Sequence, residues 1–350
     1  MKHFFYTLLL LPCCLRAQSL RINPGAQVIA TGAPHIVLNN IPMVNNGYFT
    51  SGNSTVLFTG TVYTYIGGNN PVSFYNLAVN IPSGELQLYN NATVNGTIAI
   101  DSGNLQLNAW TLRLGSTARI TGERNEARIT SRSGGTITIT TLLNAPHALN
   151  PGNIGVEITS EANLGTTTII RGHAMQGNTQ TPTAIQRYFD INPSLHTDAP
   201  ATLRFFYFDA ELGDNDKNEL NLFAAPPGQN NWTAAGKDYG DATGNWLLKS
   251  NIKPFQRFTL APAFNITANA SVQVYPNPSR DVFTLSLFST TEKQAVVSLR
   301  DQRGHVLETR TIHCLPGINK TEWRIGRYAA GAYHLVFEKL NIKNTTVLKQ

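Results

Sequence analysis

The chain has 350 residues, of which 14% are charged and 41% hydrophobic, and its formal net charge is +6. At roughly 100 to 200 residues per domain, this length predicts two or three domains and excludes a small disulfide-stabilised scaffold. Charged residues are scarce against a usual ~25%, so Asn, Gly, Ser and Thr make up most of the polar part, which is typical of an all-β protein and excludes charge-driven disorder.

The N-terminus has the pattern of a secretory signal peptide, residues 1–17. A short cationic start precedes an apolar stretch over residues 4–15, and Ala17 is a small residue before the predicted cut between Ala17 and Gln18. The apolar stretch is shorter than the ~20 residues that span a membrane. We therefore predict export of the mature chain.

Cleavage after Ala17 leaves Cys314 as the one cysteine of the sequence, so we predict no intramolecular disulfide and a buried thiol. A lipoprotein signal is the alternative at the N-terminus, because Cys13 and Cys14 follow an apolar run. It is disfavoured because Pro12 stands where such a signal needs a small residue.

The charge of the mature chain is unevenly distributed. Residues 272–350 hold 11 Lys and Arg against 6 Asp and Glu, whereas residues 18–271 hold 14 against 15. A nucleic-acid-binding protein needs a basic surface on its main body, and this body is neutral. We therefore exclude nucleic acid as a partner.

Residues 18–145 consist of short β runs separated by Gly and Asn. Ser83–Leu88 (SGELQL) recurs nineteen residues later as Ser102–Leu107 (SGNLQL). A repeat of this length is one coil of a β-solenoid, in which alternate leucines point inward and stack on the previous coil. The alternative is a pair of adjacent hairpins in a β-sandwich. The predicted core leucines are Leu86, Leu88, Leu105 and Leu107.

This region contains few ionisable side chains that could carry out acid-base catalysis. Between Ile22 and Leu112 the acidic and imidazole side chains are Glu85, Asp101 and His35. Solenoid polysaccharide lyases and hydrolases need ionisable groups on successive coils. The chain also lacks a Gly-x-Ser-x-Gly elbow, a His-Glu-x-x-His pair and a phosphate-binding glycine loop. We predict a protein that is not an enzyme, and any hydrolase activity would have to reside in residues 146–265.

Residues 146–265 show short strands with long polar connections, which predicts a β-sandwich module. Arg171, His173, Arg187 and Asp190 are candidates for an anion-binding or catalytic cluster. The simpler interpretation is an ion pair between Arg187 and Asp190 at the end of a strand, covering aromatic surface. Single histidines without metal-ligand spacing are expected at the surface: His35, His147 and His196.

The densest acidic cluster of the chain is a weak candidate for a calcium site, because carboxylate oxygens two residues apart suit that ion. It lacks the glycine position of an EF-hand loop, and Lys217 interrupts it. The alternative is a solvated hairpin loop, and no other cofactor is expected. The candidate ligands are Asp209, Glu211, Asp214, Asp216 and Glu219.

The C-terminal residues 272–350 contain an ordered series of turn and strand motifs. Two prolines in Tyr275-Pro276-Asn277-Pro278 restrict the chain where it enters a strand. The Asp301-x-x-Gly304 sequence supplies the acceptor and the flexible residue of a hairpin turn. Further motif positions are Gly317, Gly331, Tyr333, Leu335 and Lys349.

This series resembles the type A C-terminal sorting domain, or Por secretion tail, of the type IX secretion system of Bacteroidetes. The resemblance implies an Ig-like β-sandwich at residues 272–350, recognition by the type IX translocon and removal by a sortase-like peptidase, often with attachment to surface lipopolysaccharide. The low-charge coils resemble β-solenoid passengers of such surface proteins, and residues 146–265 resemble a module often found ahead of the sorting domain.

The sequence therefore predicts an all-β exported protein at the outer-membrane surface or outside the cell, with a solenoid-like passenger, a β-sandwich module and a sorting domain. We expect a non-catalytic role in adhesion or surface structure. The alternative is a glycan or host-surface ligand, since exposed aromatic rings stack on sugars. The candidate stacking residues are Tyr63, Tyr65, Tyr75, Trp232 and Trp246.

Overall fold

The computed structural model describes most of the chain after Gln18. The described residues are 19–176, 184–195, 199–229, 232–262, 270–289, 292–315, 317–338 and 344–350. The predicted cleavage site at Ala17 and Gln18, and also His196, lie outside them. The described residues form strands and three short 3-10 helices, η1 (Pro151–Asn153), η2 (Asp209–Glu211) and η3 (Lys217–Glu219), which confirms the all-β prediction.

None of the described residues lies in a helix that is long and apolar enough to cross a membrane. The chain divides into two compact units, and the boundary in the sequence falls between Thr130 and Ser131.

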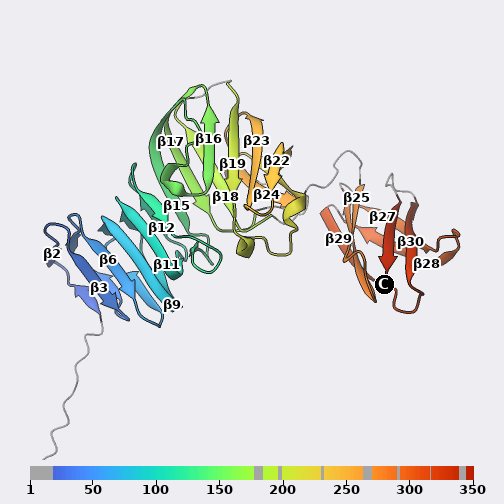
Figure 1. The fold of residues 1–350 in the computed structure, drawn as a ribbon, viewed down its shortest axis with the longest axis horizontal. Coiled ribbons are helices and arrows are strands. Elements are labelled where there is room, and N and C mark those ends of the chain that lie inside the picture. The colour runs from blue at the N-terminus through green and yellow to red at the C-terminus, as the bar shows by residue number, and fades with distance from the viewer. Residues whose placement is uncertain are drawn as a thin grey trace, which may run out of the picture. The chain divides into compact units, whose positions relative to one another are not determined.

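The first unit is a parallel β-solenoid (Figure 1). Each coil contributes one strand to each of three faces. One face carries β3 (His35–Asn39), β6 (Thr55–Thr59), the first parts of β9 (Asn76–Leu88) and β11 (Thr97–Gln106), and β13 (Arg119–Thr121). The second face carries β1 (Leu20–Ile22), β4 (Met43–Asn45), β7 (Thr64–Gly67), the later parts of β9 and β11, and β14 (Ile129–Thr130). The third face holds β2 (Gln27–Ile29), β5 (Tyr48–Thr50), β8 (Val72–Phe74), β10 (Ala92–Val94) and β12 (Thr111–Leu114).

The register of the coils confirms the predicted repeat. Leu86 of β9 lies directly beside Leu105 of β11 in a parallel pair. Leu86, Leu88, Leu105 and Leu107 are each 0% exposed, as predicted for core positions. Because these neighbours pair in parallel, the hairpin alternative for this region is wrong.

The repeated Ser-Gly pair forms a corner at which β9 and β11 pass from the first face to the second. Gly103 has φ +72°, and a Cβ atom there would lie 2.3 Å from the carbonyl oxygen of Ile81 on the previous coil. A side chain is therefore excluded both by backbone conformation and by space. The strand register shifts at the same corner, between Ile100 and Asn104.

Asparagine side chains join successive coils, which explains the abundance of this residue type. The Asn76 Oδ1 atom accepts a hydrogen bond from the Thr97 amide at 2.8 Å. The Asn108 Nδ2 atom donates to the Leu88 carbonyl at 2.9 Å. Such bonds satisfy backbone groups at corners where the ladder of strand hydrogen bonds is interrupted.

The second unit begins with two antiparallel sheets. One sheet contains β15 (Thr136–Asn144), β17 (Asn163–Gly172), β18 (Tyr188–Pro193), β24 (Arg257–Pro262), β20 (Leu220–Ala225) and β21 (Thr233–Gly236). The other contains β16 (Val156–Ser160), β19 (Ala201–Phe206), β23 (Trp246–Ile252) and β22 (Tyr239–Asp241). Phe189 and Phe205 meet edge to face across the two sheets, with ring centroids 4.8 Å apart. We call residues 131–262 the two-sheet module.

One strand that we assigned to the solenoid region pairs in this module. Residues 136–144 form β15, which pairs antiparallel with β17. The alternation of Thr and Ile in β15 is equally compatible with a parallel coil or an antiparallel sheet, so its pattern did not identify its partner.

The C-terminal segment forms two further antiparallel sheets around one core. The first is β25 (Ala270–Tyr275), β26 (Val282–Ser289) and β29 (Gly317–Arg324), and the second is β28 (Val306–Cys314), β27 (Lys293–Arg300), β30 (Gly331–Glu338) and β31 (Thr345–Lys349). Phe283 and Trp323 of the first sheet share this core with Leu335 of the second. Cys314 is buried in the same core, as predicted.

Candidate functional site

The motif residues of the C-terminal segment occupy the turn and core positions expected of them. The Asp301 carboxylate accepts hydrogen bonds from the amides of Arg303 and His305, each at 2.9 Å, and closes the hairpin between β27 and β28. Tyr333 and Leu335 point into the core of the two sheets. Gly317 and Gly331 are the first residues of β29 and β30.

Asn277 ties the start of this segment to its last strand. Its Nδ2 atom donates to the Thr346 carbonyl at 2.8 Å, and its Oδ1 atom accepts from the Leu348 amide, also at 2.8 Å. The Ser279 amide adds a bond to the Leu348 carbonyl at 2.8 Å. The proline-containing segment at Asn277 is therefore joined by hydrogen bonds to β31, which ends at Lys349. The sequence alone did not indicate this pairing.

The five acidic residues proposed for calcium are not brought together. Glu211 is buried and binds Arg187, Asp209 lies 2.7 Å from the Lys217 ammonium, and Asp216 accepts from the Asn218 amide at the start of η3. Asp214 and Glu219 lie at the surface. Within the described residues, no group of three or more His, Cys, Asp or Glu side chains gathers as a metal site. Three of the carboxylates instead stabilise the local fold.

Glu211 and Arg187 form the most deeply buried ion pair described. The Arg187 Nη2 and Nε atoms lie 2.7 Å and 3.1 Å from the same Glu211 oxygen, and both side chains are almost fully buried. The second Glu211 oxygen accepts from the Phe208 amide at 3.0 Å. This pair attaches the loop after β19 to the interior of the module.

The predicted ion pair between Arg187 and Asp190 is therefore wrong. Asp190 instead receives two hydrogen bonds from Arg257 of the neighbouring strand, at 2.6 Å and 2.7 Å. The reason is that side chains three apart along a strand point to opposite faces. Arg171 is also buried and donates to the Ile154 carbonyl at 3.2 Å, so this cluster is structural rather than an open anion site.

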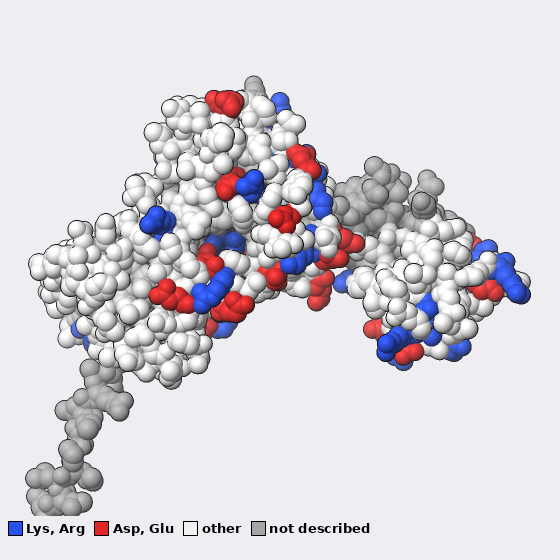
Figure 2. Space-filling view, in the orientation of Figure 1, with Lys and Arg blue, Asp and Glu red and all other residues white. Residues whose placement is uncertain are grey.

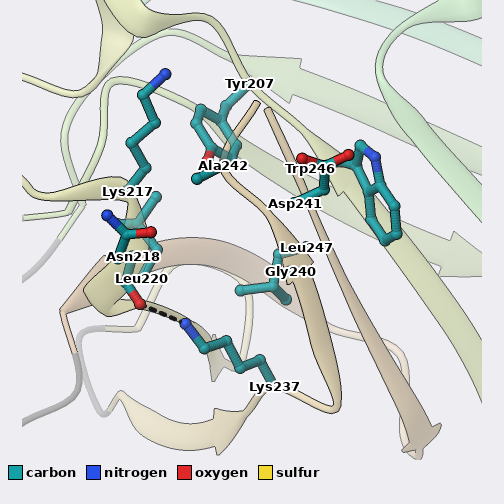
Figure 3. Close-up of a pocket in the computed structure, with 10 residues that line it drawn as sticks. All are labelled: Tyr207, Lys217, Asn218, Leu220, Lys237, Gly240, Asp241, Ala242, Trp246 and Leu247. Atoms are coloured by element: carbon teal, nitrogen blue, oxygen red, sulfur yellow. Dashed lines mark hydrogen bonds between the residues drawn. The ribbon is translucent and has the colours of Figure 1, made fainter. Parts of the chain in front are cut away.

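A small, partly open pocket of about 70 Å³ lies in the two-sheet module (Figure 3). Tyr207 and Trp246 line it together with Asp241. Burial, followed by the nearby carboxylates of Asp209 and Asp241, raises the pKa of Tyr207 to about 12. The phenol is thus a neutral hydrogen-bonding group at ordinary pH.

The two ammonium groups at this pocket are engaged within the module. Lys237 donates to the Asn218 carbonyl at 2.6 Å (Figure 3), and Lys217 binds both Asp209 and the Asn245 side chain. The Lys217 charge is thus paired with a carboxylate, whereas Lys237 is held by a neutral carbonyl.

Both candidate tryptophans, Trp232 and Trp246, are half-buried and contact neighbouring side chains. Trp246 has the Arg204 guanidinium 4.5 Å from its ring centroid and the Tyr239 ring 5.3 Å away. Trp232 packs against a small core cluster that includes Phe223. Neighbours from other strands therefore cover part of each half-buried ring, and a sugar-stacking role for either tryptophan stays a prediction.

The tyrosine candidates of the solenoid have a different environment. Tyr63 and Tyr65 stack with ring centroids 6.3 Å apart and an angle of 29° between the ring planes. Tyr89, which the sequence analysis missed, meets Tyr65 edge to face at 5.6 Å. Tyr63 and Tyr89 are 46% and 48% exposed. Tyr75 is exposed at another corner, between β8 and β9.

We call Tyr63, Tyr65, Tyr89 and Gln87 the tyrosine patch. It assembles because β7 and β9 are neighbours on the second face, with Tyr65 in register with Gln87. The Tyr63 hydroxyl donates to the Tyr89 hydroxyl at 3.0 Å, and the Tyr89 hydroxyl donates to Gln87 Oε1 at 2.8 Å. Partial burial and the Tyr89 hydroxyl raise the pKa of Tyr63, so its phenol stays neutral.

The solenoid around this patch carries little charge. Figure 2 shows few blue or red side chains over the N-terminal region on the face in view, and more of both over the two-sheet module. His35 lies on β3 and His147 in the loop after β15, and both are exposed and distant from the patch in the sequence. The patch therefore offers aromatic and amide groups on a nearly neutral scaffold.

Comparison with known proteins identifies one segment. Residues 273–349 match the family described as the secretion system C-terminal sorting domain. This match confirms the resemblance on which the delivery route was predicted. No curated protein matches the chain significantly.

Proposed function

We propose a function that starts from the delivery route: the chain is secreted cargo of the type IX secretion system, directed by residues 273–349 to the outer-membrane surface or the extracellular space. Once there, it acts as a non-catalytic adhesion or surface-structural protein. The solenoid of residues 19–130 is the contact part, and the sorting domain serves delivery. Its partners in delivery include the translocon, a sortase-like peptidase and surface lipopolysaccharide.

The tyrosine patch is the observation that supports adhesion most directly. Exposed aromatic groups held together on one surface are typical of interaction sites. The parallel coils fix the ring positions through strand pairing, which reduces the entropy lost when a partner binds. Adhesion needs such a rigid contact surface and no ionisable catalytic groups.

We expect cells that display the full chain to adhere to host-cell monolayers or abiotic surfaces better than cells displaying a chain without residues 19–130. Surface labelling with an antibody to the two-sheet module provides the control for equal display. Equal adherence at equal surface density would contradict a contact role for the solenoid.

The second candidate function is glycan binding, and the same patch favours it. Tyrosine rings beside an amide present the combination of apolar face and hydrogen-bonding groups that sugars require. The adherent surface would then be a polysaccharide of another cell or of a matrix.

The delivery route itself predicts a defined export defect. A reporter carrying residues 1–17 and 272–350 is expected at the cell surface or in the medium of a bacterium with the type IX system. Deleting Leu335–Gln350 removes β31 and half of β30, and should retain the reporter in the periplasm. Fractionation followed by immunoblotting measures this, and surface delivery after the deletion would refute the assignment.

A point substitution tests the same connection more finely. Asn277→Ala removes both bonds to β31 and is expected to reduce export several-fold. Arg303→Ala changes an exposed residue of the same segment and should leave export unchanged. Equal export by the two variants would show that the Asn277 bonds do not matter for recognition.

A further inference from the structure

We infer that the tyrosine patch is a binding site for a neutral, extended polysaccharide. The inference rests on the proposed contact role of the solenoid and names the ligand class for it. Three properties of the patch carry it: ring geometry, the direction of its hydrogen bonds, and its charge.

The rings offer apolar faces that are already in place before a ligand binds. The Tyr63 and Tyr65 rings stack at 29°, and Tyr89 contacts Tyr65 at 87°. About half of the Tyr63 and Tyr89 surface stays open to solvent. The C–H face of a pyranose ring packs on such aromatic surfaces, and tyrosine loses little conformational entropy when it does so.

The hydrogen bonds of the patch run in one direction. Tyr63 donates to Tyr89, Tyr89 donates to Gln87, and the Gln87 amide donates to the Glu85 carboxylate. The phenol protons of Tyr63 and Tyr89 are thus used inside the patch, and the Tyr63 oxygen offers lone pairs to an incoming group. A ligand rich in hydroxyl groups supplies the donors that this arrangement accepts.

The charge of the region selects against anions. Glu85 places a carboxylate beside the rings, and no Lys or Arg occurs in the sequence from Ile22 to Leu112. A polyanion would meet repulsion from Glu85, and residues 22–112 supply no cation to offset it. A protein partner is less favoured, because stable protein interfaces bury roughly 1,200 to 2,000 Å² and this patch is only a few side chains wide.

The shape of the scaffold favours a chain over a single sugar. Tyr63 and Tyr65 belong to one coil, and Gln87 and Tyr89 to the next. Neighbouring coils lie ~4.8 Å apart, so successive units of an extended polymer meet successive coils. Asn108, on the coil beyond, bonds to Gln87 and continues the polar surface in this direction.

Affinity electrophoresis of the full chain tests the inference directly. The gels contain hydroxyethylcellulose, glucomannan, dextran or mannan as neutral polysaccharides, and alginate as an anionic one. We expect at least one neutral polymer to retard the chain, and alginate not to do so. Tyr63→Ala and Tyr89→Ala should each lower the association constant at least tenfold.

Tyr48→Ala is the matched control, because it removes an exposed tyrosine of the same solenoid on β5, outside the patch. Its binding should equal that of the unchanged chain, and circular dichroism melts verify that all variants fold. Retardation by no neutral polymer, retardation mainly by alginate, or equal loss in Tyr48→Ala would each overturn the site. Cell adherence that persists in Tyr89→Ala and resists competition by soluble polymer would refute the ligand class and leave the adhesion role standing.

Discussion

Arg187→Met is expected to lower the free energy of unfolding of the two-sheet module by roughly 3 to 5 kcal/mol, because removal of one partner leaves a buried charge uncompensated. Arg187 is 1% exposed and donates to the Phe206 carbonyl at 3.1 Å as well as to Glu211. Methionine fills part of the space but donates no hydrogen bond to Glu211 or to the Phe206 carbonyl. Urea denaturation followed by hydrogen exchange at amides of β18 and β19 measures the loss.

Two further variants give this prediction its control. Arg204→Met removes an ion pair to Glu157 that is partly open to solvent, and should cost about 1 kcal/mol or less. Combining Arg187→Met with Glu211→Leu removes both charges and should recover most of the lost stability. A single Arg187→Met variant as stable as Arg204→Met would show that the buried pair does not hold the module together.

Leu105→Ala is expected to destabilise the solenoid by roughly 2 to 5 kcal/mol through lost burial and the cavity left behind. Leu105 is 0% exposed and stacks between coils, in register with Leu86 on one side and Ile129 on the other. Each coil buries its apolar side chains only against its neighbours, so a defect in a middle coil affects both. Hydrogen exchange at amides of β9 and β11 reports the local opening free energy.

The control for this variant is Val37→Ala, which shortens a side chain that is 55% exposed on the first face of the same solenoid. It should change stability by no more than about 0.5 kcal/mol. A Leu105→Ala variant within that limit would mean that the coils do not depend on their stacked leucines.

The solenoid was predictable because its information is local and repeated. Two copies of Ser-Gly-x-Leu-x-Leu specify a corner and an inward-facing pair, and Leu86 beside Leu105 follows from the nineteen-residue spacing. The Asp301 turn was predictable for a similar reason, since one carboxylate and one glycine within four residues close it.

Partners distant in the chain were not predictable in this way. Arg187 and Asp190 are only three residues apart in the sequence, yet they do not bind each other. Arg187 binds Glu211, and Asp190 binds Arg257. The acidic loop follows the same rule, because composition does not reveal that Glu211 pairs with the buried Arg187. Strand order decides such pairs, and strand order depends on the packing of the whole module.

The sequence by itself determined the delivery route, the coil repeat and the low charge of the solenoid, because short motifs and composition carry each of them. The tertiary structure decided which aromatic residues form a surface. In the folded chain the Arg204 guanidinium lies over the Trp246 ring. The register of neighbouring coils places Tyr89 beside Tyr63 and Tyr65. Side chains more than twenty residues apart meet there because parallel strands align equivalent positions of successive coils, and only the stacked fold sets that alignment.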